Sequence, residues 1–200
     1  MQKQMRPSIV TERRRGKILS VLRHRKPDLT VVMEDIHDPH NVSAMLRSAD
    51  AVGILEVQLV YVTELFPKLG KKSSASATKW VRRRKFTSIR ECYDTLHAEG
   101  FTICATHLGT RSASLYELDL TGKIALVFGN EHRGVSDDAA GAADKNFQIP
   151  MVGMIQSLNV SVACAVTLYE AFRQREARGL SGSMASEELQ RMLEEWTSRR

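Results

Sequence analysis

The chain has 200 residues and a net charge of +6, and 42% of its residues are hydrophobic and 26% charged. These values are ordinary for a soluble protein of one domain with or without appendages, and neither internal repeats nor low-complexity tracts occur. Because no apolar run approaches the ~18 residues of a membrane span, and the amino-terminal residues lack the apolar core of a secretory signal, we expect a cytoplasmic protein without a membrane partner.

Hydrophobic periodicity and turn residues predict helices that alternate with strands. In chain order we expect a helix over 11–25, a strand over 29–35, a helix over 41–52, a strand over 56–62, a long loop over 63–79 and a short exposed strand over 80–86. There follow a helix over 88–100, strands over 101–108 and 123–130, a short helix over 136–144, a strand over 145–151, a long helix over 159–179 and a final amphipathic helix that begins near Glu187. This alternation predicts an α/β fold with a mostly parallel sheet.

Two short blocks carry the positive charge of the chain. Residues 1–26 have a net charge of +8 and residues 68–85 again +8, so the rest of the chain has a net charge of −10. A single charged run is usually solvated surface. Two such blocks on an acidic body favour a nucleic-acid partner, because clustered cations bind phosphates by releasing counterions.

Several kinds of site find no support in the sequence. The chain has neither GxGxxG nor GxxxxGK[ST], the usual pyrophosphate loops, and no GxSxG nucleophile elbow. It also has no HExxH and no Cys/His cluster, since His37 and His40 stand only three apart in a loop, so no metal site is expected. Cys92, Cys104 and Cys164 lie far apart in apolar surroundings, which predicts free buried thiols in a reducing compartment.

Three polar segments follow predicted strands, at 38–50, 128–136 and 149–163. Ligands of open α/β sheets bind beyond the carboxyl ends of strands, so these segments are expected to converge. Taken singly, Asn41, Ser157 and Asn159 could each be a helix cap. Glu131 could be a solvated turn residue, yet the placement of all these residues after strands favours a common site.

The three segments resemble the three signature motifs of the SPOUT-class RNA ribose 2′-O-methyltransferases, and most closely those of the TrmH branch. Asn41 and Arg47 match the first motif, Glu131 in FGNEHRGVS the second, and Ser157 and Asn159 in IPMVGMIQSLNVSVA the third. The resemblance is nearly continuous from about residue 13 to 180 and includes KPDLTVVMEDIHDPHNVSAMLRSADAVGI and KWV. The basic amino-terminal helix and the EELQRMLEEW helix also resemble this branch.

The resemblance implies an α/β domain with a deep trefoil knot, which periodicity alone cannot predict because knots are rare. It divides the chain into a basic helical extension over 1–27, a SPOUT methyltransferase domain over 28–179 and an amphipathic helix over 180–200. It also implies a homodimer whose active sites take residues from both chains, which fits the long helix, apolar nearly all round through Phe172. The implied reaction is 2′-O-methylation of a guanosine ribose in the D-loop of tRNA, with S-adenosylmethionine (SAM) as methyl donor and without metal.

The same resemblance assigns the site residues. The expected SAM contacts are Thr106, His107, Leu108, Gly129, Ile149, Met151 and Leu158. The expected catalytic residues are Asn41, Arg47, Glu131, Ser157 and Asn159. Asn41 is expected to orient Arg47 or the ribose, and Glu131 to shape the loop on the cofactor side. Ser157 and Asn159 are expected to hold substrate phosphate or polar groups of SAM at the start of the long helix.

Arg47 is the residue that the resemblance assigns to activation of the ribose 2′-hydroxyl. A free guanidinium has a pKa above ~12 and donates protons, so it is poorly suited to be a general base. We therefore expect Arg47 to hold the adjacent phosphate and to lower the pKa of the 2′-hydroxyl electrostatically. A literal base role would need a pKa shift induced by the substrate.

The basic blocks are expected to contact tRNA phosphates, since neither has the interleaved aromatic residues of a base-stacking surface. The expected RNA contacts are Arg13, Arg14, Arg15, Lys17, Lys71, Lys72, Arg82, Arg83, Arg84, Arg173 and Arg175. Two alternatives stay open: the same ribose methylation on ribosomal RNA or at another tRNA position, and a non-catalytic RNA-binding protein. The intact motif residues, Arg47 and Asn159 among them, argue against the second.

Overall fold

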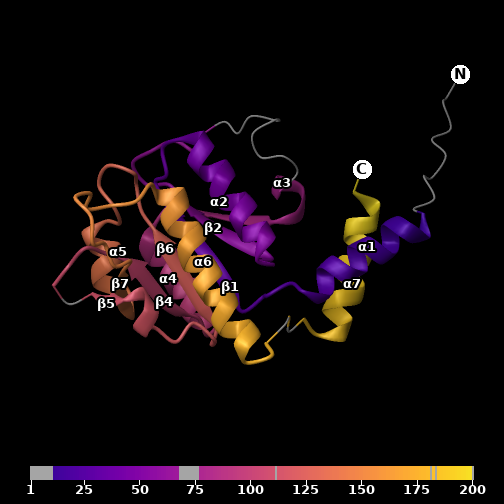
Figure 1. The fold of residues 1–200 in the computed structure, drawn as a ribbon. Helices are drawn as coiled ribbons and strands as arrows, with labels where there is room; N and C mark the ends of the chain where they lie inside the picture. The colour runs from indigo at the N-terminus through magenta and orange to yellow at the C-terminus, as the bar shows by residue number, and fades with distance from the viewer. Residues whose placement is uncertain (1–10, 68–76, 111, 181, 183, 200) are drawn as a thin grey trace, which may run out of the picture.

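A seven-stranded sheet forms the centre of the computed structural model, which describes residues 11–67, 77–110, 112–180, 182 and 184–199 (Figure 1). The strand order is β3-β2-β1-β6-β4-β7-β5, and each pairing of neighbouring strands is parallel. The strands are β1 (Leu29–Glu34), β2 (Glu56–Val60), β3 (Arg82–Phe86), β4 (Thr102–Thr106), β5 (Ala113–Ser114), β6 (Ile124–Phe128) and β7 (Lys145–Gln148). The predicted α/β class is confirmed, and only the two-residue strand β5 lies where no strand was expected.

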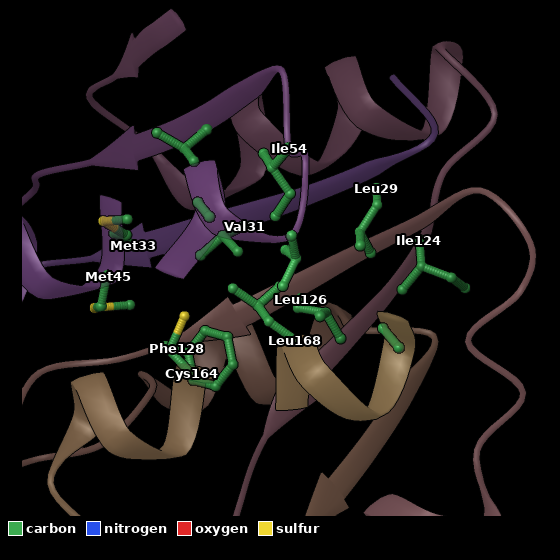
Figure 2. Packing of buried hydrophobic residues seen from close by; sticks show 14 of the residues in the cluster. Leu29, Val31, Met33, Met45, Ile54, Ile124, Leu126, Phe128, Cys164 and Leu168 are labelled. Atoms are coloured by element: carbon green, nitrogen blue, oxygen red, sulfur yellow. The ribbon is translucent and has the colours of Figure 1, made fainter. Parts of the chain in front are cut away.

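Helices cover both faces of this sheet, in agreement with the burial of every residue of β1 and β6. They are α1 (Glu12–Arg23), α2 (Pro39–Ala51), α3 (Ala77–Trp80), α4 (Ile89–Ala98), α5 (Asp137–Ala142), α6 (Val160–Ala177) and α7 (Ser186–Ser198), with a 3-10 turn at Leu115–Glu117. On one face, Leu126 and Phe128 of β6 pack against Cys164 and Leu168 of α6 (Figure 2). On the other face, side chains such as Val127 pack against α4 and α5. Each fully buried aliphatic side chain contributes about 1.5–3 kcal/mol to folding.

The α1 and α7 helices lie side by side at one end of the molecule and have a small core of their own (Figure 1). Ile18 and Leu22 of α1 meet Met192 and Trp196 of α7 there. Arg25 fixes this pair to the sheet domain: its guanidinium lies 5.1 Å from the Trp196 ring centroid and donates to the Ile54 carbonyl at 2.6 Å and to Asp50. The expected amino- and carboxyl-terminal appendages therefore form one packed unit, although their predicted boundaries stay predictions.

Most predicted boundaries move by a few residues, and two of the changes have a clear local cause or form a new element. The α2 helix begins at Pro39, earlier than the predicted Asn41, because the Asp38 side chain caps it by accepting from the His40 amide at 2.8 Å. The short helix α3 contains the last part of the predicted loop over 63–79 and also Trp80, so the predicted strand over 80–86 begins only at Arg82. Lys71 and Lys72 lie outside the described residues.

Three further expectations concern thiols, membranes and the knot. Cys92, Cys104 and Cys164 are free and buried, as predicted, and burial raises the pKa of Cys104 to about 11 and of Cys92 to about 12. In the described parts of the chain no helix is long and apolar enough to cross a membrane. The trefoil knot stays a prediction.

Candidate active site

A cavity of about 630 Å³ lies at the carboxyl ends of β6, β4 and β7, three neighbouring strands. Its volume is in the range that proteins use for small-molecule ligands. All seven residues expected to contact SAM line this cavity: Thr106, His107, Leu108, Gly129, Ile149, Met151 and Leu158. They follow strands that are distant in sequence but adjacent in the sheet, which is why a parallel sheet brings them together.

The turn after β6, residues 129–134, forms one wall of the cavity. Asn130 and Gly134 close the turn as an antiparallel bridge. A Cβ atom at Gly129 would overlap the Gly134 carbonyl and the Val135 amide, so the close approach of the two strands of this turn requires glycine there.

Side chains from all three polar segments meet beside this cavity. The Asn41 Nδ2 group of α2 donates to Glu131 Oε1 at 2.9 Å, and Asn159 Nδ2 donates to Asn41 Oδ1 at 3.1 Å. Asn41 is only 8% exposed, and Glu131 and Asn159 line the cavity. The expected convergence of the three segments is therefore confirmed.

Glu131 holds the loop that leads into α2. Its carboxylate accepts from the backbone amides of His37 and Asp38, each at 3.0 Å, as well as from Asn41. Burial alone would raise the pKa of Glu131, but these hydrogen bonds outweigh it and the pKa is lowered. Glu131 is thus an ionised acceptor that fixes where Asn41 points.

Of the three residues that could each have been a helix cap, Asn41, Ser157 and Asn159, only Asn159 caps a helix. Asn159 caps α6, since its Oδ1 accepts from the Ser161 amide at 2.9 Å, and it also belongs to the site through Asn41. Asn41 is not a cap, because it stands in the first turn of α2 behind Asp38. Ser157 is exposed, lines the cavity and precedes the capping residue.

Arg47 is the one expected catalytic residue that the single chain does not bring to the others. It is exposed on the outer side of α2, whereas its neighbours Leu46 and Ala49 are buried. It does not line the cavity, and the described residues give its guanidinium no hydrogen bond and no ion pair.

The expected RNA contacts differ in how their charges are held. Arg13, Arg15 and Lys17 are exposed on α1, while Arg14 donates to the Arg199 carbonyl. On the edge strand β3, two of the three consecutive arginines are held by carboxylates: Arg82 donates to Glu195 at 2.6 Å, and Arg84 donates to Glu99 at 2.5 Å. Arg83 lies between them and is exposed. Arg173 is also exposed but pairs with Glu170 at 2.8 Å.

Arg175 was expected to contact RNA, and this prediction is wrong. Its side chain is 1% exposed and forms an ion pair with Asp28 at 2.8 Å. It also donates to the carbonyls of Leu120, at 3.0 Å, and of Gly122. Arg175 therefore ties α6 to the loop before β6, and it cannot reach a phosphate without breaking a buried ion pair.

Sequence reasoning missed Asp35 and Asn130. Asp35 is buried directly after β1 and has a left-handed backbone with φ of 49°, which is uncommon for any residue other than glycine. Asn130 Nδ2 donates to the Asp35 carbonyl at 2.8 Å. An acidic residue that directly follows a buried strand is the signal that could have drawn attention to Asp35.

Comparison with known proteins agrees with this geometry. Residues 28–169 match the model of the SpoU rRNA Methylase family. The tRNA (guanosine(18)-2′-O)-methyltransferase of Thermus thermophilus is 46% identical over 188 residues, which cover 93% of this chain and 96% of that protein. The crystal structure of the A. aeolicus TrmH/SpoU tRNA modifying enzyme is 38% identical, with a TM-score of 0.87 over 93% of this chain and 95% of that chain.

A third relative was solved with a cofactor. The SpoU methyltransferase AviRb from Streptomyces viridochromogenes, in complex with AdoMet, is 26% identical with a TM-score of 0.70, over 80% of this chain and 65% of that chain. The match over residues 28–169, the identity to full-length relatives and the common parallel sheet lead to one conclusion. The chain belongs to the SpoU methylase family.

Proposed function

We propose that this protein transfers a methyl group from SAM to the ribose 2′-hydroxyl of guanosine 18 in the D-loop of tRNA. The observation that carries the proposal is the hydrogen-bonded set Asn41, Glu131 and Asn159 at the edge of the cavity. It occurs in a chain that matches a tRNA (guanosine(18)-2′-O)-methyltransferase over nearly its whole length. Action in the cytoplasm and a reaction without metal stay predictions.

The cavity has the chemistry that SAM needs. Leu108, Ile149 and Leu158 offer apolar walls for an adenine ring, and Glu131 and Asp137 offer carboxylates for the positive groups of SAM. When bound, SAM supplies a methyl group that the adjoining sulfonium makes electrophilic. We propose the seven cavity residues named above as its contacts.

Asn41 is proposed to orient the ribose. An ionised carboxylate only accepts hydrogen bonds, so the contact with Glu131 must come from the Asn41 amide nitrogen, and its oxygen faces Asn159. One N–H of Asn41 then remains for the substrate. Because Glu131 and Asn159 hold both ends of the amide, this N–H has a fixed direction before RNA binds, and such preorganisation favours catalysis.

We propose a homodimer in which Arg47 acts at the cavity of the other subunit. Apolar side chains of α6 and of the segment before it are uncovered in the single chain, among them Met154 at 100% exposure and Ile155 at 62%, with Val162 and Tyr169 on α6. The same segment and helix contribute Leu158 and Ala163 to the cavity. An exposed patch of this kind is typical of a protein interface. Arg47 is exposed on α2, which packs against α6, so a second copy on this patch would bring its Arg47 toward the cavity.

At that cavity the Arg47 guanidinium would hold the phosphate next to the reacting ribose. Its charge would stabilise the oxygen anion that develops as the 2′-hydroxyl proton passes to solvent water, while the oxygen–methyl bond forms and the methyl–sulfur bond breaks to leave a neutral thioether. Exposed Arg13, Arg15 and Lys17 of α1 and Arg83 of β3 are proposed to dock the rest of the tRNA through phosphates.

The proposal is tested with two tRNA transcripts that differ only at one oxygen. Transcripts with guanosine or 2′-deoxyguanosine at position 18 are incubated with the protein and SAM labelled in the methyl group, then digested and mapped. We expect label only in the first transcript, as 2′-O-methylguanosine at position 18. Label at another position would overturn the assignment, and so would label in ribosomal RNA, assayed in parallel, without label in the tRNA transcripts.

A further inference from the structure

Asp35 connects three segments around the candidate active site, beginning with the segment after β2. Its carboxylate accepts from the backbone amides of Val62, at 2.9 Å, and Glu64, at 3.1 Å, and from the Thr63 hydroxyl at 2.7 Å. The amino-terminal half of the β1–α2 loop is thereby fixed to the end of β2.

The second connection runs to the turn that lines the cofactor cavity. The Asp35 carbonyl accepts from Asn130 Nδ2 at 2.8 Å, and Asn130 Oδ1 in turn accepts from the His132 amide at 2.9 Å. Arg133 Nη2 lies 3.4 Å from Asp35 Oδ2 and donates to Thr63 Oγ1 at 2.8 Å. One residue therefore holds both sides of the turn that carries Glu131.

Asp35 adopts an unfavourable backbone conformation in a buried position. A left-handed backbone is unfavourable for most L-residues, and glycine would avoid the cost. The Asp35 residue is also only 5% exposed. Burial would raise the pKa of its carboxyl, but hydrogen bonds from Thr63 and from the amides of residues 62–64 outweigh it, so the pKa is lowered and the group is ionised. Strained residues that persist in this way cluster at functional sites.

We propose that Asp35 is a positioning residue, which sets the turn 129–134 against the loop before α2 so that Glu131 and Asn41 meet in the reactive arrangement. Asp35 does not touch the substrate in this account and acts through the turn and Glu131. The inference rests on the proposed methyl transfer for its kinetic consequence, whereas its structural consequence can be measured without substrate.

Two variants separate the carboxylate from the backbone. Asp35→Asn keeps a residue that tolerates the left-handed conformation but lacks the charge, and Asp35→Gly relieves the backbone and removes the side chain. Asp119→Asn is the matched control, because Asp119 accepts from the Thr121 amide at 3.0 Å, from the Thr121 hydroxyl at 2.5 Å and from Arg178 at 3.4 Å in an exposed turn.

We expect both Asp35 variants to lower kcat on the order of 10²-fold, the usual cost of small misplacements. The KM for tRNA should stay within about threefold, and the control should keep the wild-type kcat. If only the backbone conformation mattered, Asp35→Gly would be fully active, and that result would overturn the proposal. Loss of folding in both variants would overturn it too, since Asp35 would then be a residue of the fold.

Amide hydrogen exchange of the protein without RNA gives a second readout. Exchange should become faster at 62–64 and 130–134 in both Asp35 variants and should stay unchanged there in Asp119→Asn. Unchanged exchange at 130–134 would contradict the proposed connection. If the wild type did not methylate tRNA, the proposed function would fail while the exchange result would still decide the role of Asp35.

Discussion

The candidate active site and the α1–α7 pair bury opposite kinds of side chain. At the site, Asn41 is buried and hydrogen-bonded to Glu131 and Asn159. In the pair, the buried side chains are apolar, Trp196 among them, and cations such as Arg13 face outward. A reaction needs atoms held to within fractions of an ångström, which the ends of core strands can supply. Contacts with phosphates tolerate small displacements, so an outlying helix can carry them.

The largest effect is expected from Arg47, the residue proposed to act in the transition state. Arg47→Ala should lower the single-turnover rate on the order of 10³-fold, yet leave the Kd for SAM unchanged in calorimetry. Arg47→Lys should retain less than about a tenth of the rate, because a point charge does not reproduce the planar guanidinium. A lysine variant above that level, a cost under ~1.4 kcal/mol, would exclude bidentate phosphate binding.

A substitution in the small core between α1 and α7 should destabilise this pair without changing the candidate active site. Trp196→Ala should lower the free energy of unfolding by about 3 kcal/mol, because Trp196 is 1% exposed in the small core. Denaturant titration measures this loss, and equilibrium binding should show weaker tRNA affinity beside an unchanged Kd for SAM. A loss of SAM binding in a folded variant would show that the two regions do not work separately.

Glu131 gives the site a dependence on pH. Its lowered folded-state pKa means that its contribution to stability is present above the unfolded pKa of about 4.3 and is lost as the pH falls through the folded pKa. Glu131→Gln should therefore flatten the fall in unfolding free energy below about pH 4.3. At neutral pH it should lower kcat on the order of tenfold, since the amides of His37 and Asp38 lose a charged acceptor. If the unfolding free energy of Glu131→Gln fell below about pH 4.3 as steeply as that of the wild type, Glu131 would not be the source of this pH dependence.

The smallest effect should separate two adjacent arginines of β3. Arg83→Ala should weaken tRNA binding about threefold and reduce the slope of log K against log salt by about one. Arg84→Ala is the control: its guanidinium is already paired with Glu99, so the salt slope should change less and the thermal stability more. Equal slopes for the two variants would show that exposure on the edge strand does not decide which arginine contacts RNA.

Features that depend on neighbouring residues could be predicted from the sequence, and features that depend on remote partners could not. The run of buried residues in β1 and the polar residues after β1, β6 and β7 are neighbours in the chain, so strands and site segments could be recognised. The outcome for Arg175 depends on Asp28 and Leu120, which are remote in sequence. Composition does not show whether an arginine is buried or exposed, so Arg175 could not be separated from the RNA-contacting arginines on the sequence alone. The left-handed backbone of Asp35 likewise follows from partners that only the folded sheet brings together.

The central claim, that the site of one subunit is completed by Arg47 of another, can be tested by mixing two inactive variants. Arg47→Ala and Asn159→Ala chains are co-expressed with different tags, and the heterodimer population is assayed on tRNA with labelled SAM. If Arg47 and Asn159 come from different subunits, each heterodimer has one intact site of two, so the isolated heterodimer should have about half of the wild-type activity, and an unseparated mixture formed by random pairing about a quarter. If both residues act within one chain, neither site is intact in any dimer, and an inactive mixture would contradict the account.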